Sequence, residues 1–391
     1  MTNLAAWQTA FKAHPFTISP APMPIPKPHQ IIIQTRSIGI NPADAAVQHL
    51  GMVYNDNEDK FPMILGFDVA GSVHAVGSEV TRFKPGDRVA AYSIDITPEK
   101  YESPRGCFQL YCAANAALTF HVPEKVSFSE AAVFPSCLCV AAYALFLQST
   151  LAMALPPITG TAEPNDKVLI VWGGSSVVGS FAIQLARLAG YSVIATSSEL
   201  NFSHCLSLGA EKVFNYKNPK VVDDIIAACE GRQSAGVFVA YYNNDSTIAC
   251  AEIASRVAGN KTVATVAPPN MPPPEVADKT VKIVASKSFL PSSSTQTSSP
   301  ITNLPCPTDW APALGSTPEG TQLLTNWLTP ALADGRFKLS PRPEILGQGL
   351  EALQGAVDTM FERLHTLGPN ARARAEGKSI APRKIVVEIV A

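Results

Sequence analysis

The residues best placed to do chemistry form a glycine-rich turn behind a short apolar run. Gly173 and Gly174 follow the apolar residues 168–172, and an amphipathic pattern continues to Gly190. This order predicts a strand, a tight turn and a helix, with a second strand over residues 191–195. The amides of such a turn and of the helix start can face a pyrophosphate, so a dinucleotide-binding domain is predicted. A βαβ unit that binds no nucleotide is the alternative.

The cofactor contacts expected of this domain begin with six turn and helix-start residues: Gly173, Gly174, Ser175, Ser176, Val177 and Val178. Ser197 and Ser198 stand at the second strand tip, where NAD-binding domains place an acidic residue on the ribose 2′-hydroxyl. Small hydroxyls leave room for a 2′-phosphate. Tyr216 and Lys217 offer a ring for the adenine and a cation for that phosphate. NADPH is therefore favoured over NADH. The adjacent Glu199, by contrast, would favour NADH.

Composition describes an ordinary globular enzyme. The chain has 391 residues, of which 46% are hydrophobic and 16% charged, which is enough for two domains with ample core. The formal net charge of −2 gives no reason to propose nucleic acid or a membrane as a partner. No hydrophobic signal core is evident, and the eight cysteines form no disulfide framework, so a cytoplasmic protein is expected. The oligomeric state stays open.

The rest of the sequence predicts the strands, turns and helices that must position the glycine turn. Residues 31–40 predict a strand of an antiparallel, barrel-like domain, and residues 41–44 break it into a turn or short helix. Alternating prolines in residues 19–29 predict an extended connector without ladder pairing. Further patterns predict a turn at 84–87, helices at 221–229, 248–258, 321–333 and 345–364, and strands at 259–266 and 384–390. Ala264 and Thr265, at a strand tip, are expected to pass the nicotinamide.

The ordered motifs resemble the medium-chain dehydrogenase/reductase superfamily across essentially the whole chain. They are NPAD at 41–44, LGFDVAG at 65–71, VG at 76–77, PGDRV at 85–89, EAAVFP at 130–135 and the glycine turn. The resemblance implies an α/β fold in which a Rossmann domain, a doubly wound parallel sheet, is inserted in a GroES-like β-barrel catalytic domain. The implied boundaries are residues 1–138, 139–305 and 306–391.

Within that superfamily the chain looks like the zinc-free branch of quinone oxidoreductases and enoyl reductases. The insert LPPI at 155–158, ATSS followed by Asn201, and FNYK are similar to fungal trans-acting enoyl reductases that assist polyketide synthases. The resemblance adds Asn201 to the cofactor-binding residues. At the family's zinc positions stand Ala43 with Asp44, Phe67 with Asp68, and Cys137. A catalytic zinc needs about three N or S ligands, so no metal is expected.

The resemblance implies NADPH-dependent reduction of a polarised carbon–carbon double bond, in an enoyl thioester or an enone of polyketide or secondary metabolism. The substrate is a small molecule or an acyl chain on a carrier protein, with a polyketide synthase as the partner. Tyr54 is the first candidate for the proton donor, against a surface or lid tyrosine. Asp44 holds the nicotinamide ribose or caps the following turn. The alternatives are a zinc-free quinone oxidoreductase and a member that binds NADPH with little or non-redox activity.

Overall fold

The chain divides by its internal contacts into two units, Met1–Ser136 with Lys338–Ala391, and Cys137–Phe337. The computed structural model describes residues 2–51, 61–93, 106–266, 276, 278–285, 317, 320, 322–365 and 383–389. The second boundary differs from the predicted return to the first domain at residue 306. The reason is aromatic packing inside the second unit, where Phe337 lies 5.5 Å from the ring of Phe181 and 5.5 Å from that of Trp327.

The second unit contains a parallel sheet of six strands in the order β11-β10-β9-β12-β13-β14. The strands are β9 (Lys167–Trp172), β10 (Ser192–Ser197), β11 (Lys212–Asn215), β12 (Gln233–Val239), β13 (Thr262–Thr265) and β14 (Lys282–Ala285). From β9 the chain first runs outward through β10 and β11, and then returns to pair β12 on the other side of β9. This reversal is the topological switch point of a doubly wound fold, which confirms the predicted domain.

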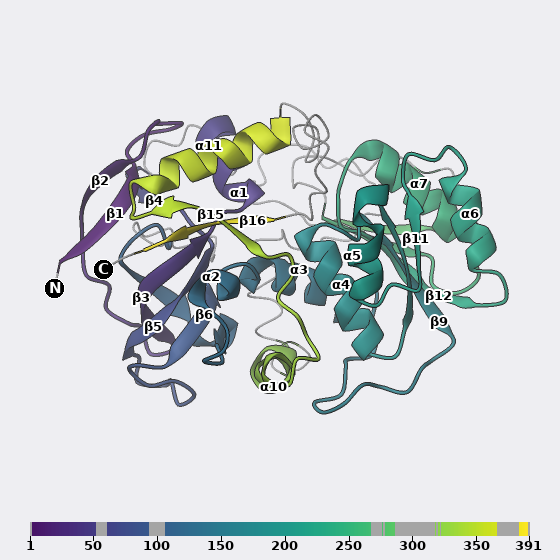
Figure 1. Ribbon diagram of the computed structural model, residues 1–391, viewed down its shortest axis with the longest axis horizontal. Coiled ribbons are helices and arrows are strands. Elements are labelled where there is room, and N and C mark those ends of the chain that lie inside the picture. Colours follow the sequence, from purple (N-terminus) through teal and green to yellow (C-terminus); the bar gives the residue numbers. More distant parts are fainter. Residues whose placement is uncertain are drawn as a thin grey trace. The chain divides into compact units, whose positions relative to one another are not determined.

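Helices cover both faces of this sheet. They are α4 (Val177–Leu188), α5 (Phe202–Ser207), α6 (Val221–Ala228) and α7 (Asn244–Arg256). The second unit also contains α10 (Leu328–Ala333), preceded by π-helical Gln322–Trp327. Along β9, Val168, Ile170 and Trp172 share one hydrophobic cluster with residues of α6 and α7. Successive strand side chains alternate in direction, so Leu169 and Val171 face the opposite side. In Figure 1 the strands lie between α4 with α5 and α6 with α7.

The first unit is organised around the long strand β3 (Gln30–Gly39). One edge of β3 pairs with β5 (Asp68–Val76), and the other pairs with β7 (Tyr111–Asn115) and β16 (Lys384–Glu388). Gly39 is opposite both Asp68 and Val386, so β5 and β16 flank β3 at this residue. A Cβ on Gly39 would stand 2.2 Å from the carbonyl oxygen of Ala132, which only glycine avoids.

The remaining elements of the first unit complete a mainly antiparallel architecture. The strands are β1 (Asn3–Gln8), β2 (Thr17–Ala21), β4 (Met63–Ile64), β6 (Arg88–Tyr92), β8 (Thr119–His121) and β15 (Pro343–Gln348). The helices are α1 (Pro42–Ala45), π-helical Ala46–Leu50, α2 (Phe128–Ala131) and α11 (Ala352–His365), while α3 (Pro135–Phe146) begins at the boundary between the units. Helix α11 packs on β15, β16 and α1, as Figure 1 shows.

Two sequence predictions were wrong in part. Ser19–Ala21 were expected in a connector without ladder pairing but belong to β2, where Pro20 is opposite Leu4. β2 is an edge strand, and an edge tolerates proline because one row of amides needs no partner. The helix predicted from residue 345 begins only at Ala352, since Gly347 and Gly349 adopt positive φ and residues 343–348 pair with β16.

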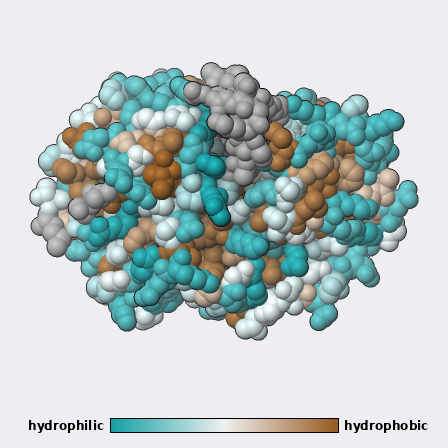
Figure 2. Space-filling view, viewed as in Figure 1, coloured by the Kyte–Doolittle hydropathy of each residue, from teal (hydrophilic) through white to brown (hydrophobic). Residues whose placement is uncertain are grey.

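The surface of the described chain mixes polar and apolar residues. Figure 2 shows brown and teal side chains interspersed, and the exposed large hydrophobic residues of the second unit include Leu200, Leu206, Tyr216, Tyr241 and Ile248. Among the described residues one helical stretch, Phe128–Phe146, passes a length and composition test for a membrane span. Its most apolar window is 72% buried, as the core helix of a globular protein is.

Candidate functional site

The parallel register places the predicted cofactor residues along one edge of the sheet. Asn215 of β11 is opposite Ser197 of β10, and Val239 of β12 is opposite both Trp172 of β9 and Thr265 of β13. The strands therefore end level with one another. The predicted residues follow in spatial order as Tyr216 with Lys217, Ser197 with Ser198, Gly173 with Gly174, and Thr265 with Ala264. Ligands bind at this carboxyl edge in open α/β sheets.

The glycine turn is tied to the neighbouring strand. Gly173 adopts φ +85°, and its amide donates to Thr196 Oγ1 at 3.1 Å, while the Gly174 amide donates to the Thr196 carbonyl at 2.8 Å. Ser176 caps α4, because its Oγ accepts the Gly179 amide at 3.0 Å. The first-turn amides of Val177 and Val178 have no intrahelical acceptor. The donors available to an anion thus begin after the glycine pair.

Close packing also fixes the start of α4. A Cβ on Gly179 would stand 2.3 Å from the Gly173 carbonyl oxygen, so any larger residue would push the helix off the turn. A Cβ on Gly173 would stand 2.8 Å from Cβ of Tyr241. Internal packing thus requires glycine at both positions, and a turn without side chains at these positions is also what a close approach by a pyrophosphate requires.

Polar groups at the second strand tip are bonded locally. Ser197 is 1% exposed and its Oγ donates to the Ser198 carbonyl at 2.9 Å, while Asn201 Nδ2 donates to Ser198 Oγ at 3.1 Å. Glu199 accepts from Asn215 Nδ2 at 3.0 Å, which holds its carboxylate toward β11. Asn201 Oδ1 and Thr265 Oγ1 are buried without a partner among the described residues. Such buried orphan atoms are rare, and two of them mark an edge suited to a polar ligand.

Two tyrosines flank this edge. Tyr216 is 37% exposed, and Tyr241, which follows β12, is 43% exposed. The pKa of Tyr241 is raised, first by partial burial and then by the neighbouring Tyr216. The sequence reasoning named Tyr216 but missed Tyr241. An aromatic residue directly after a strand that pairs with β9 was the available signal.

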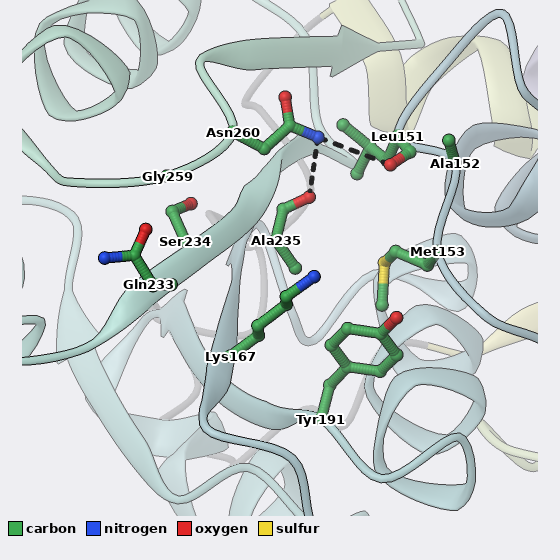
Figure 3. A pocket seen from close by; sticks show the side chains of 10 residues that line it. All are labelled: Leu151, Ala152, Met153, Lys167, Tyr191, Gln233, Ser234, Ala235, Gly259 and Asn260. Atoms are coloured by element: carbon green, nitrogen blue, oxygen red, sulfur yellow. Dashed lines mark hydrogen bonds between the residues drawn. The ribbon is translucent and has the colours of Figure 1, made fainter.

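A separate cavity of about 340 Å³ opens at the amino end of the same sheet (Figure 3). Its lining includes Lys167 at the start of β9, Gln233 at the start of β12, and Asn260. Asn260 Nδ2 donates to the carbonyls of Ala235 at 3.0 Å and Leu151 at 3.3 Å, so its amide serves the fold. This end of the sheet is opposite to the predicted cofactor edge.

The first unit buries an ion pair between strands β5 and β16. Lys384 Nζ lies 2.7 Å from Asp68 Oδ2, and the two side chains are 3% and 0% exposed. Ser136 donates to Asp68 through its amide at 2.7 Å and through Oγ at 2.6 Å, and Asn41 Nδ2 donates at 3.1 Å. Lys384 Nζ also donates to Asn41 Oδ1 at 2.5 Å. We call Asn41, Asp68, Ser136 and Lys384 the Asp68 cluster.

The Asp68 cluster does not fit a zinc site. A carboxylate offers about four lone pairs, and four donors already reach Asp68, three of them at Oδ2. The neighbouring Phe67 contributes no ligand atom. Asp68 was considered from the sequence, but Lys384 was missed because it lies 316 residues away along the chain. The absence of a catalytic metal stays a prediction, and the bonding of Asp68 supports it.

Asp44 lies beside this cluster in α1. Its Oδ2 accepts the Asn41 amide at 2.8 Å and so caps the helix, while a contact of Asp44 with the nicotinamide ribose stays a prediction. Oδ1 is buried without a partner among the described residues. Burial, helped by the nearby charge of Asp68, raises the pKa of Asp44 to about 8, so the carboxyl is largely protonated at neutral pH. Tyr54 lies outside the described residues, and its role stays a prediction.

The raised pKa of Asp44 predicts a pH-dependent stability. The unfolded carboxyl titrates near 3.8 and the folded one near 8, so its contribution is complete below pH 3.8 and is lost as the pH rises through about 8. Asp44→Asn keeps an acceptor for the Asn41 amide but cannot ionise. Denaturant unfolding between pH 4 and pH 9 should show the variant gaining several kcal/mol on the native protein. A constant difference across this range would show that folded Asp44 is ionised throughout.

Comparisons with known proteins agree with this architecture. The family model for the alcohol dehydrogenase GroES-like domain matches residues 27–136, and the model named zinc-binding dehydrogenase matches residues 177–293. Dehydrogenase pigH of Monascus ruber is 36% identical over 390 residues, which is 99% of this chain and 100% of that protein. Trans-enoyl reductase himH of Aspergillus japonicus is 29% identical over 100% of this chain and 98% of its own length.

Solved structures share the fold at lower identity. The CurK enoyl reductase has a TM-score of 0.65 at 18% identity, with 99% of each chain covered. A mycobacterial protein solved in complex with NADPH has a TM-score of 0.62 at 19% identity, with 99% of each chain covered. With its GroES-like domain and its Rossmann-type nucleotide-binding domain, the chain is an oxidoreductase of the medium-chain dehydrogenase/reductase superfamily.

Proposed function

We propose that this oxidoreductase uses NADPH to reduce a polarised carbon–carbon double bond, in an enoyl thioester or an enone. The carboxyl edge of the second unit carries the proposal, because a bare glycine turn, the first-turn amides of α4 and two buried orphan atoms meet there. The name of the relative himH, a trans-enoyl reductase, and the fold shared with an enoyl reductase support the choice of reaction.

The preference for NADPH rests on the strand tip that would meet the 2′-position of the ribose. Glu199 is bonded to Asn215, so the residue that would argue for NADH is held toward β11. Lys217 is exposed at the end of β11, beside the tip of β10 that carries Ser198. The mycobacterial neighbour was solved with NADPH, which also favours this cofactor. Tyr216 and Tyr241 offer ring faces to the adenine.

Different residues of the chain would bind the cofactor and donate the proton. The amides of Ser175, Val177 and Val178 would hold the pyrophosphate, and Thr265 Oγ1 would meet the nicotinamide half. When bound, the nucleotide would supply a hydride for the β-carbon of the substrate, and Tyr54 is the predicted donor of the proton that the α-carbon would take. With Asp68 bonded to Lys384, the developing negative charge on the carbonyl oxygen is to be stabilised by hydrogen-bond donors rather than by a metal ion.

The substrate and partner belong to the same proposal. One fungal relative is named a dehydrogenase and another a trans-enoyl reductase. We infer an acyl substrate that is free or bound to a carrier protein, with a polyketide synthase as the partner and the cytoplasm as the location. A protein that holds NADPH without turnover is the competing reading.

The reaction is tested by following NADPH oxidation with a panel of enoyl thioesters, enones and quinones. Turnover of an enoyl thioester or enone, with deuterium delivered from labelled NADPH to the β-carbon, is expected. Turnover of quinones alone would make the protein a quinone oxidoreductase. Tight NADPH binding with no acceptor reduced would identify a member without redox activity.

The cofactor preference predicts a selective effect at Lys217. Lys217→Ala should weaken NADPH binding by about tenfold or more, because a hydrogen bond between charged groups contributes about 1.5–3 kcal/mol. NADH binding should not change. Lys212→Ala is the matched control, since Lys212 is an exposed lysine at the other end of β11. Calorimetric titration of both cofactors measures this, and equal weakening of NADPH and NADH by Lys217→Ala would refute the assignment.

A further inference from the structure

The first unit gathers three side chains of metal-ligating type that are not members of the Asp68 cluster. His14 precedes β2, His49 lies in the π-helical Ala46–Leu50, and Asp358 lies in α11. One ligand atom from each residue lies within 4.8 Å of the others. We propose that His14, His49 and Asp358 bind a divalent transition-metal ion, with zinc as the ion that best suits them.

The distances are close to those that a metal needs. Asp358 Oδ1 lies 3.1 Å from His14 Nε2 and 2.9 Å from His49 Nε2. A tetrahedral zinc ion with ligands at about 2.0–2.1 Å separates neighbouring ligand atoms by about 3.3 Å. Small side-chain rotations would therefore admit the ion. Two imidazoles and one carboxylate are a donor set that zinc accepts, with a water in the fourth position.

His49 adds an independent observation. Its Nε2 is a buried atom with no hydrogen-bond partner among the described residues, although it approaches Asp358. The lone pair or proton of that nitrogen is thus not directed at the carboxylate. A bound metal ion would give that nitrogen a partner. The ring is held in place by stacking on Phe361, with centroids 4.1 Å apart and planes inclined by 16°.

A second layer of contacts orients the carboxylate. Gln354 Nε2 donates to Asp358 Oδ1 at 2.8 Å, and the amides of Gln48 and Gln354 pair at 3.0 and 3.1 Å. Gln354 Oε1 also accepts the Phe16 amide at 2.8 Å. Outer partners of this kind fix ligand orientation in metal sites. His14 is half-exposed, with a side-chain exposure of 47%, so an ion can enter from solvent.

A bound ion would link three segments that are separate in the sequence. It joins the chain before β2, the π-helical turn after α1, and the helix α11, which returns late in the sequence. Binding to the folded chain alone stabilises it by mass action. The proposed role is therefore structural, and it is independent of the reaction proposed above.

The test titrates the metal-free full-length chain with Zn²⁺ in competition with a chromophoric chelator, and separately with Co²⁺. One equivalent should bind, and Co²⁺ should absorb in the visible without the near-ultraviolet charge-transfer band of a thiolate. His14→Ala and Asp358→Asn should each weaken binding by about 100-fold or more, and Gln354→Leu by about tenfold. His29→Ala, which removes another exposed histidine of this unit, should change nothing.

Thermal unfolding supplies a second readout. Zn²⁺ should raise the Tm of the native chain and of His29→Ala, but not that of His14→Ala, whose exposed side chain can be removed without harm to the core. Failure of the native chain to bind either ion at micromolar concentration would overturn the proposal. So would thiolate absorption with Co²⁺, or metal binding that survives both His14→Ala and Asp358→Asn.

Discussion

The buried ion pair of Lys384 and Asp68 is the constraint on which the first unit depends. Lys384 opens β16, the strand that the chain adds last, and Asp68 opens β5. Both strands meet β3 at Gly39, and the pair closes that junction. The same carboxylate accepts from Ser136, the final residue before the second unit begins. Removing either charge would leave the other buried alone, which proteins tolerate poorly.

This bonding has a chemical consequence. The superfamily includes zinc-dependent members, yet here the acidic side chain after the LG motif is saturated by donors of its own unit. With Asp44 largely protonated at neutral pH, the buried charges of Asp68 and Lys384 balance. A reaction that needs only hydride delivery and hydrogen-bond donors suits such a unit better than one that needs a Lewis acid.

Local patterns in the sequence predicted the elements that carry the cofactor edge. The glycine turn, the strand before it and the helix after it depend on neighbours in the chain, so periodicity and turn chemistry were enough. The short helix at Pro42–Ala45 was also predicted, whereas the edge strand β2 and the strand β15 were not. The strand β15 forms by pairing with β16, which lies much later in the chain, whereas β2 pairs with the nearby β1 although its prolines predicted a connector.

Some residues of the candidate sites could likewise be predicted from local patterns, and others could not. Gly173, Ser198 and Lys217 follow strands whose order the motif implied, so their common edge was predictable. Lys384 could be placed only by the pairing of β16 with β3, and His14 and His49 only by the docking of α11. Tyr241 follows β12, and its position beside Gly173 appears only in three dimensions.

A double-mutant cycle on the Asp68 cluster tests the central claim most directly. Denaturant unfolding is measured for Lys384→Met, for Asp68→Asn and for the chain that carries both. Each single change should cost about 3–5 kcal/mol, because it leaves one buried charge alone. The double change should cost at least about 2 kcal/mol less than the sum of the two. Costs that add to within about 0.5 kcal/mol would show that Lys384 and Asp68 do not depend on one another, and would contradict the account.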